Sequence, residues 1–204
     1  IENQEEERIR EVIQKEKAFR DAFYNLAVFY SHVQRFDLAL RTMSHLIKHV
    51  FDVGDKAYYY FVCGQMMEQQ RDYAVAVKFY RLAYTLEPSD QQLRYFIHNN
   101  LGYSLNQLDQ YEEGERFCRV AIRIDPRRLN AHKNLGLALE GQKKYVPAVE
   151  SYLRAVMVDP VDRRALQLLQ DLLERQPQIL SEHPEFSPQV EEAVAAVRAA
   201  SEGG

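Results

Sequence analysis

The chain has 204 residues, of which 46% are hydrophobic, and a formal net charge of −4. A net negative charge argues against general binding to nucleic acid or to anionic membranes, because both need a basic protein surface. No run of 18 apolar residues occurs, so nothing in the sequence predicts direct membrane insertion.

The first segment, residues 1–19, is strongly charged. Ile9, Val12 and Ile13 recur at helical spacing within it and predict a helix with one apolar stripe. In phase with the repeats described below, we interpret this helix as the second half of a truncated repeat, packed under the first complete one. The chain does not begin with Met, which predicts that residues upstream have been removed.

Three equal intervals then run from a glycine to a proline. Each proline follows its glycine by 24 positions: Gly64 to Pro88, Gly102 to Pro126 and Gly136 to Pro160. Between them, a Tyr, a small residue and an Ala recur at matching offsets, as Tyr73, Ala76 and Ala83, then Tyr111, Gly114 and Ala121, then Tyr145, Ala148 and Ala155. A short unit that repeats in this way buries its apolar face only by stacking on its own copies.

Windows of 34 residues set on these intervals begin at Ala57, Tyr95 and Leu129 and resemble the tetratricopeptide repeat (TPR), a helix–turn–helix unit. The matching places of the first window are Tyr60, Cys63, Gly64, Met67, Ala76, Tyr80, Ala83 and Pro88, and the other two windows agree at the same places. The resemblance implies an all-α, right-handed TPR superhelix of about four repeats with capping helices at both ends. A small residue at places 8 and 20 lets the two helices approach, and the proline at place 32 ends the second helix.

The resemblance divides the chain as follows: a divergent first repeat at 20–53, which lacks the Gly and the closing Pro, and further repeats at 57–90, 95–128 and 129–162. Gly54 to Lys56 form a spacer between the first two repeats. Asp90 is a predicted helix cap that lengthens the first helix of the third repeat. A capping helix at 163–176 and a proline-punctuated tail at 177–204 with a short helix complete the chain, and whether this tail packs on the body stays open.

No catalytic motif is evident, and we expect neither cofactor nor metal. Cys63 and Cys118 occupy core places and are expected to be buried free thiols, which favours a reducing, cytoplasmic compartment. His45 and His49 have metal-ligand spacing, but two ligands do not make a site. His98 and His132 fall where the family has a large packing residue, and the Arg127-Arg128 and Arg163-Arg164 pairs are interpreted as solvated helix starts.

In TPR proteins the first helices line a concave groove, and the resemblance places aromatic and amide side chains there. The candidate peptide-binding residues are Tyr24, Asn25, Tyr58, Phe61, Gln65, Phe96, Asn99, Asn100, Tyr103, Lys133 and Asn134. Asn25, Asn100 and Asn134 share place 6, where TPR proteins such as the O-GlcNAc transferase pair an Asn amide with the ligand backbone. The residue set by which another TPR subclass grips chaperone carboxylates is incomplete, because Leu137 stands where an Asn is required.

We therefore expect a non-catalytic interaction module that binds an extended partner segment with apolar anchors, as an adaptor, co-chaperone or assembly factor. Two alternatives remain open at this stage. One is a structural scaffold that self-associates as a homo-oligomer through its terminal helices. The other is a regulatory domain of a larger enzyme.

Overall fold

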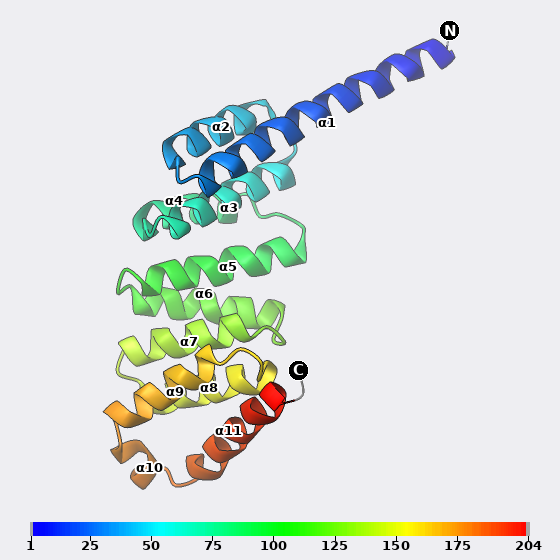
Figure 1. The fold of residues 1–204 in the computed structure, drawn as a ribbon. Helices are drawn as coiled ribbons and strands as arrows, with labels where there is room; N and C mark the ends of the chain where they lie inside the picture. Colours follow the sequence, from blue (N-terminus) through cyan, green and yellow to red (C-terminus); the bar gives the residue numbers. More distant parts are fainter. Residues whose placement is uncertain (1, 203–204) are drawn as a thin grey trace. The chain divides into compact units, whose positions relative to one another are not determined.

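A computed structural model describes residues 2–202, and these residues form eleven α-helices (Figure 1). The helices are α1 (Glu2–His32), α2 (Phe36–His49), α3 (Val53–Gln69), α4 (Tyr73–Thr85), α5 (Gln91–Asn106), α6 (Tyr111–Ile124), α7 (Leu129–Gly141), α8 (Tyr145–Val158), α9 (Arg164–Arg175), α10 (Gln178–Glu182) and α11 (Phe186–Glu202). The fold is all-α, as predicted. None of the helices in this range is both long and apolar enough to cross a membrane.

Contacts divide the chain into two compact units, unit 1 (Ile1–Glu87) and unit 2 (Pro88–Gly204). Unit 1 contains the helix pairs α1/α2 and α3/α4, and unit 2 contains α5/α6 and α7/α8 followed by α9 to α11. Each of the four pairs is a helix–turn–helix, the arrangement that the repeat pattern implied.

The turns inside the four pairs share one backbone conformation. Gln34, Arg71, Asp109 and Lys143 each have φ between 59° and 63°, in the left-handed region. The residue after each of them donates its N–H back to a helix carbonyl, as when Lys144 N donates to Leu139 O at 2.9 Å. These bonds satisfy carbonyls that the end of a helix would otherwise leave unpaired. In all four turns, a residue other than glycine occupies the left-handed position, where glycine is usual.

The close approach of paired helices explains the repeated glycines. A Cβ added to Gly64 would lie closer than 3.0 Å to three ring atoms of Tyr80, and one added to Gly136 would meet Tyr152 in the same way. Both tyrosines are fully buried. The expectation that a small residue at place 8 lets the helices approach is confirmed at these two positions.

Each of these tyrosines also makes a polar contact that the sequence did not suggest. Tyr80 donates its hydroxyl to Glu68 at 2.8 Å, and Tyr152 donates to Glu140 at 2.8 Å. The repeat between them carries Cys118 and Asn106 at the corresponding places. The tyrosine and the glutamate thus occur together or are replaced together.

The first helix differs from expectation. Residues 1–19 were interpreted as a separate helix packed under the first repeat, but α1 runs without a break from Glu2 to His32. Ile9, Val12 and Ile13 are 56%, 63% and 57% exposed. The physical reason is that no Gly or Pro interrupts the sequence before the first turn at Gln34, so one helix continues through the predicted boundary.

The boundaries of two other helices can also be compared with expectation. The predicted spacer at Gly54 to Lys56 is wrong, because these residues form the first turn of α3, where Asp52 accepts a hydrogen bond from Asp55 N at 2.8 Å. Asp90 caps α5 by accepting from Leu93 N at 2.6 Å, so the lengthened first helix of that repeat is confirmed.

The C-terminal tail packs on the body of unit 2. Phe186, Ala193 and Val197 are buried in the same hydrophobic cluster as Leu166 and Leu169 of α9. The helix that carries them, α11, has 17 residues rather than the short helix expected, and it contacts α8 and α9. It begins one residue before Ser187-Pro188, which form its first turn. The tail therefore supplies part of the core of unit 2.

Candidate peptide-binding faces

The predicted site residues divide between the two units. Helices α1 and α3 carry five of them in unit 1, and α5 and α7 carry six in unit 2. The face formed by α1 and α3 is called the unit 1 face, and the face formed by α5 and α7 is called the unit 2 face.

Two tyrosines meet on the unit 1 face. The hydroxyl groups of Tyr24 and Tyr58 lie 3.0 Å apart and share a hydrogen bond, and the ring centroids are 6.0 Å apart. Burial, together with the hydrogen bond to Tyr58, raises the pKa of Tyr24 to about 12. An ion pair between Arg20 and Asp55 at 2.7 Å lies on the same two helices. Because Tyr58 remains 40% exposed, the tyrosine pair presents ring surface to solvent.

The other three residues of this face differ in exposure. Asn25 and Gln65 are exposed, whereas Phe61 is only 5% exposed. The Phe61 ring lies 5.8 Å from the buried Tyr80 ring. The expectation that Phe61 is exposed and can anchor a ligand is therefore wrong, since its ring packs into the core beside Tyr80, the tyrosine at place 24 of the repeat.

Three asparagines form a row on the unit 2 face. Asn134 Nδ2 donates to Asn99 Oδ1 at 3.1 Å, and Asn99 Nδ2 donates to Asn100 Oδ1 at 3.0 Å. Asn99 is 7% exposed, Asn134 is 3% exposed and Asn100 is half-buried. We call these three residues the asparagine row. The structure brings the predicted amides together, but it pairs the buried ones with each other.

Lys133 is a buried cation beside the row. It is 9% exposed, and its Nζ donates to Asn130 Oδ1 at 3.0 Å. Burial lowers the pKa of Lys133, and the charge of Arg164 lowers it further, while Asp162 opposes the shift. Burial therefore works against the charged form of Lys133 and leaves little of its side chain open to a ligand.

The aromatic residues of the unit 2 face are half-buried. Phe96 lies under the guanidinium of Arg128, which is 5.0 Å from the Phe96 ring centroid and 4.9 Å from that of Tyr95. Tyr103 is also half-buried. The sequence analysis did not predict that Arg128 packs on the aromatic rings of α5. Its position two residues after Pro126 could have suggested such a contact.

Three of the four arginines in the pairs after the last two prolines form ion pairs with carboxylates, and Arg163 donates to Ser201 Oγ at 2.6 Å. Asp125 contacts Arg127 at 3.4 Å and Arg128 at 3.0 Å, and Asp162 forms an ion pair with Arg164. The hydrogen bond from Arg164 is the main cause that holds the pKa of Asp162 at about 2. These basic pairs are thus partly neutralised where they stand.

Four histidines were considered from the sequence, and the contacts of three of them are local or aromatic. His98 Nδ1 lies 2.7 Å from Arg94 O, and His132 Nε2 lies 2.8 Å from Pro126 O. Burial is the main cause that lowers the pKa of both rings. His45 stacks on Phe23 at 4.9 Å. Within residues 2–202, no group of three or more His, Cys, Asp or Glu side chains is placed to hold a metal ion.

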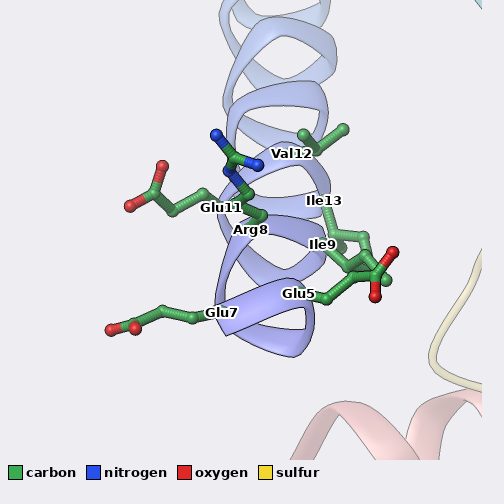
Figure 2. A pocket seen from close by; sticks show the side chains of 7 residues that line it. All are labelled: Glu5, Glu7, Arg8, Ile9, Glu11, Val12 and Ile13. Atoms are coloured by element: carbon green, nitrogen blue, oxygen red, sulfur yellow. The ribbon is translucent and has the colours of Figure 1, made fainter. Parts of the chain in front are cut away.

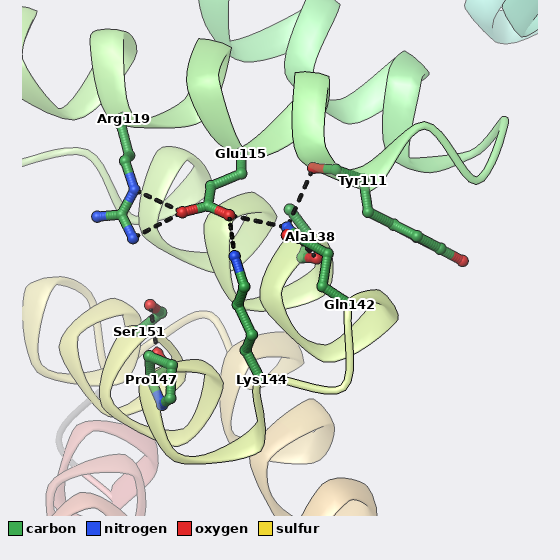
Figure 3. Close-up of polar contacts among 8 residues, drawn as sticks. All are labelled: Tyr111, Glu115, Arg119, Ala138, Gln142, Lys144, Pro147 and Ser151. Carbon is green, nitrogen blue, oxygen red and sulfur yellow. Dashed lines mark hydrogen bonds and ion pairs between the residues drawn. The ribbon is translucent and has the colours of Figure 1, made fainter.

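A polar network joins α6 to the turn between α7 and α8 (Figure 3). Glu115 accepts from Arg119 at 2.8 Å, from Gln142 at 2.8 Å and from Lys144 at 3.2 Å. Burial tends to raise the pKa of Glu115, but these hydrogen bonds outweigh it and the pKa is lowered. Because all four residues lie within unit 2 and their bonds join successive helix pairs, we assign this network to stability.

The two cysteines are buried free thiols, as expected. Burial raises the pKa of both Cys63 and Cys118 to about 12. Neither thiol is therefore suited to nucleophilic chemistry at neutral pH.

Comparison with known proteins agrees with this geometry. Residues 97–128 match the family described as tetratricopeptide repeat. The chain is 32% identical over 97 residues to small glutamine-rich tetratricopeptide repeat-containing protein 2 of Mycosarcoma maydis, covering 48% of this chain and 26% of that protein. It is 28% identical over 105 residues to tetratricopeptide repeat domain-containing protein PYG7 of Arabidopsis thaliana, covering 52% of this chain and 35% of that protein. The chain thus spans about a third or less of the length of these relatives.

Among solved structures, MamA from Desulfovibrio magneticus RS-1 superposes with a TM-score of 0.68 and 19% sequence identity, covering 89% of this chain and 96% of that one. At this identity the likeness concerns the fold. Together with the repeat match over residues 97–128 and the helix pairs, it shows an all-α fold of stacked helix pairs of the tetratricopeptide repeat type, similar to that of MamA.

Proposed function

We propose that this chain is a non-catalytic interaction module that binds an extended segment of a partner protein on its first-helix faces. TPR domains are generally protein-interaction modules, and the fold is usually non-catalytic. The partner class is a peptide segment with apolar anchors, and the role is that of an adaptor, co-chaperone or assembly factor.

The observation that carries this proposal is the asparagine row on the unit 2 face. An amide offers both a donor and an acceptor, so Asn100, held by the two buried amides, can pair with the backbone of an extended peptide without reading its side chains. The bonds from Asn134 to Asn99 and from Asn99 to Asn100 fix the side chains before a ligand arrives. Fixed groups lose less conformational entropy on binding than mobile ones.

Hydrogen bonds alone do not supply enough binding energy. Each contributes about 0.5–1.5 kcal/mol net, whereas ordering a flexible peptide costs about 1–2 kcal/mol per residue. Burial of apolar ligand groups has to supply the difference. On the unit 2 face, which carries the row, the half-buried Phe96 and Tyr103 can do this.

The proposed contact residues therefore differ from the sequence-based set in two ways. Phe61 is left out because it is in the core. Asn134 is assigned to holding the row, because it is 3% exposed and its amide donates to Asn99. Asn100 is the member of the row best placed to reach a ligand, since it is half-buried.

The test is selection of 12-residue peptides from a random display library on the 204-residue chain, followed by affinity measurement with single variants. We expect Asn100→Ala and Tyr103→Ala each to weaken binding about five- to tenfold, as expected for the loss of about 1–1.4 kcal/mol. Met157→Ala is the control, because Met157 is an exposed apolar residue of unit 2 that lies on α8. Equal affinity of all four proteins would place the binding site elsewhere and refute the proposal.

We further propose a cytoplasmic location, because the two buried free thiols favour a reducing compartment.

A further inference from the structure

The N-terminal half of α1 projects beyond α2 (Figure 1). All of the side chains from Glu7 to Ala18 are exposed, and the first half-buried side chain is that of Phe19. Seventeen residues of helix before Phe19 correspond to about 25 Å of length. Helices of this length are only marginally stable in water and normally depend on tertiary packing. The exposed segment receives no such stabilisation within its own chain.

One side of this projecting segment is apolar. Ile9, Val12 and Ile13 point to the same side of α1, whereas Glu7 and Glu11 point to the other side (Figure 2). Each of the three apolar side chains is more than half exposed. We call them the α1 stripe.

Charge is distributed unevenly on either side of the stripe. Residues 2–7 contain four Glu and no basic residue, so they carry a charge of −4. Residues 15–20 contain Lys15, Lys17 and Arg20 against Glu16, so they carry +2, although Arg20 is already paired with Asp55. The segment is therefore acidic at one end and basic at the other, and the α1 stripe lies between these ends, together with Arg8, Arg10 and Glu11.

We propose that the α1 stripe docks antiparallel on the same segment of a second copy of this chain. A two-fold axis at residue 11 places Ile9 level with Ile13 of the second copy. The same axis places the acidic residues 2–7 of each copy beside the basic residues 15–20 of the other. Parallel docking would place acid beside acid. Such a contact is isologous and closes at two copies.

The contact is small. A pair of helix segments of about 25 Å with one three-residue stripe lies at the low end of interface sizes, so the pairing is weak and reversible. Part of the attraction comes from exposed charges, so it decreases as salt is added. This inference does not depend on the proposed peptide binding, because the stripe precedes Tyr24 and Asn25, the predicted peptide-binding residues of α1.

The first experiment is sedimentation of the 204-residue chain from about 5 to about 500 µM, the range in which a weak contact of this size dissociates. We expect a monomer–dimer equilibrium that Val12→Gln weakens at least tenfold. Gln is a good helix former and Val12 touches no core, so this variant keeps its fold. Val161→Gln, which changes an exposed valine of unit 2, is the matched control and is expected to leave the equilibrium unchanged. A monomer at every concentration, or a dimer that Val12→Gln does not weaken, overturns the proposal.

The orientation is tested separately with a spin label at Ala18→Cys. Ala18 is exposed, and the native cysteines are buried and do not take up label. In the antiparallel pair, residue 18 lies level with residue 4 of the second copy, so the two labelled positions are separated by about 21 Å along the helix axes. In a parallel pair they are separated only by the interhelical spacing of about 8–10 Å. A single short distance between labels overturns the antiparallel arrangement.

Discussion

Replacement of Gly136 by alanine is expected to destabilise unit 2 although alanine is the better helix former. The added Cβ would lie closer than 3.0 Å to three atoms of the Tyr152 ring, which is fully buried. Overpacking of this kind costs about 1–3 kcal/mol. If the ring moves far enough to lose its 2.8 Å hydrogen bond to Glu140, a further 1.5–3 kcal/mol or so is lost.

Against this loss, Gly to Ala in a helix gains about 1 kcal/mol. With the ring displaced and its hydrogen bond lost, the net expectation is a destabilisation of about 1.5–5 kcal/mol. Urea denaturation followed by circular dichroism measures it. Gly54→Ala is the control, because a Cβ there meets only the exposed Asp52 side chain at 3.1 Å. A second variant that also carries Tyr152→Leu removes the colliding ring, so the two changes should be less than additive. A Gly136→Ala protein as stable as the wild type would refute the close-packing argument.

Three further predictions concern the turns, the asparagine row and pH. Lys143→Gly should stabilise the chain by about 1 kcal/mol, because Lys143 has φ 61°, and thermal unfolding measures the gain. Asn134→Ala should cost about 1–3 kcal/mol by leaving Asn99 Oδ1 without its buried donor; unchanged urea stability would contradict this. The pKa of Asp162 is held at about 2 by Arg164, and that of Glu115 is lowered despite burial by its three hydrogen bonds. Both carboxylates therefore stabilise the fold fully above about pH 4.5, and this stabilisation is lost as the pH falls through the folded-state pKa values. Urea titrations between pH 7 and pH 2 should show this loss, with a smaller loss in Asp162→Asn.

The repeats were predictable because their packing leaves regular marks in the sequence. Gly64 and Gly136 mark close helix contacts, and the Asp90 cap marks the start of α5. Residues 1–19 were misassigned because the repeat phase suggested a boundary where the backbone had no reason to stop. Helix continuity is decided locally, by the absence of Gly and Pro before Gln34.

The candidate site was only partly predictable. The place of a residue in the repeat predicts which helix face it occupies, but not how deeply its side chain is buried. Phe61 falls at a groove place, yet its ring reaches Tyr80 in the core. The asparagines fall on the predicted face, but their mutual hydrogen bonds depend on the spacing of α5 and α7, which no sequence pattern encodes. Tyr80 occurs with Glu68, and Tyr152 occurs with Glu140, at the same two places of their repeats. This co-occurrence could have predicted the two hydrogen bonds, but the repeat pattern was read one place at a time.

In the α5/α6 repeat, Cys118 and Asn106 stand in place of the Tyr–Glu pair of its neighbours. This exchange affects the cooperativity of unfolding. Where the pair is present, its buried polar bond stays inside one repeat. Asn106 instead donates to the backbone oxygen of Asn134 in the next repeat, at 2.8 Å. In a nearest-neighbour description of repeat proteins, the first kind of bond adds to intrinsic stability and the second adds to the coupling between neighbours. The α5/α6 and α7/α8 repeats of unit 2 are therefore tied together, and neither can melt without breaking a bond that belongs to both.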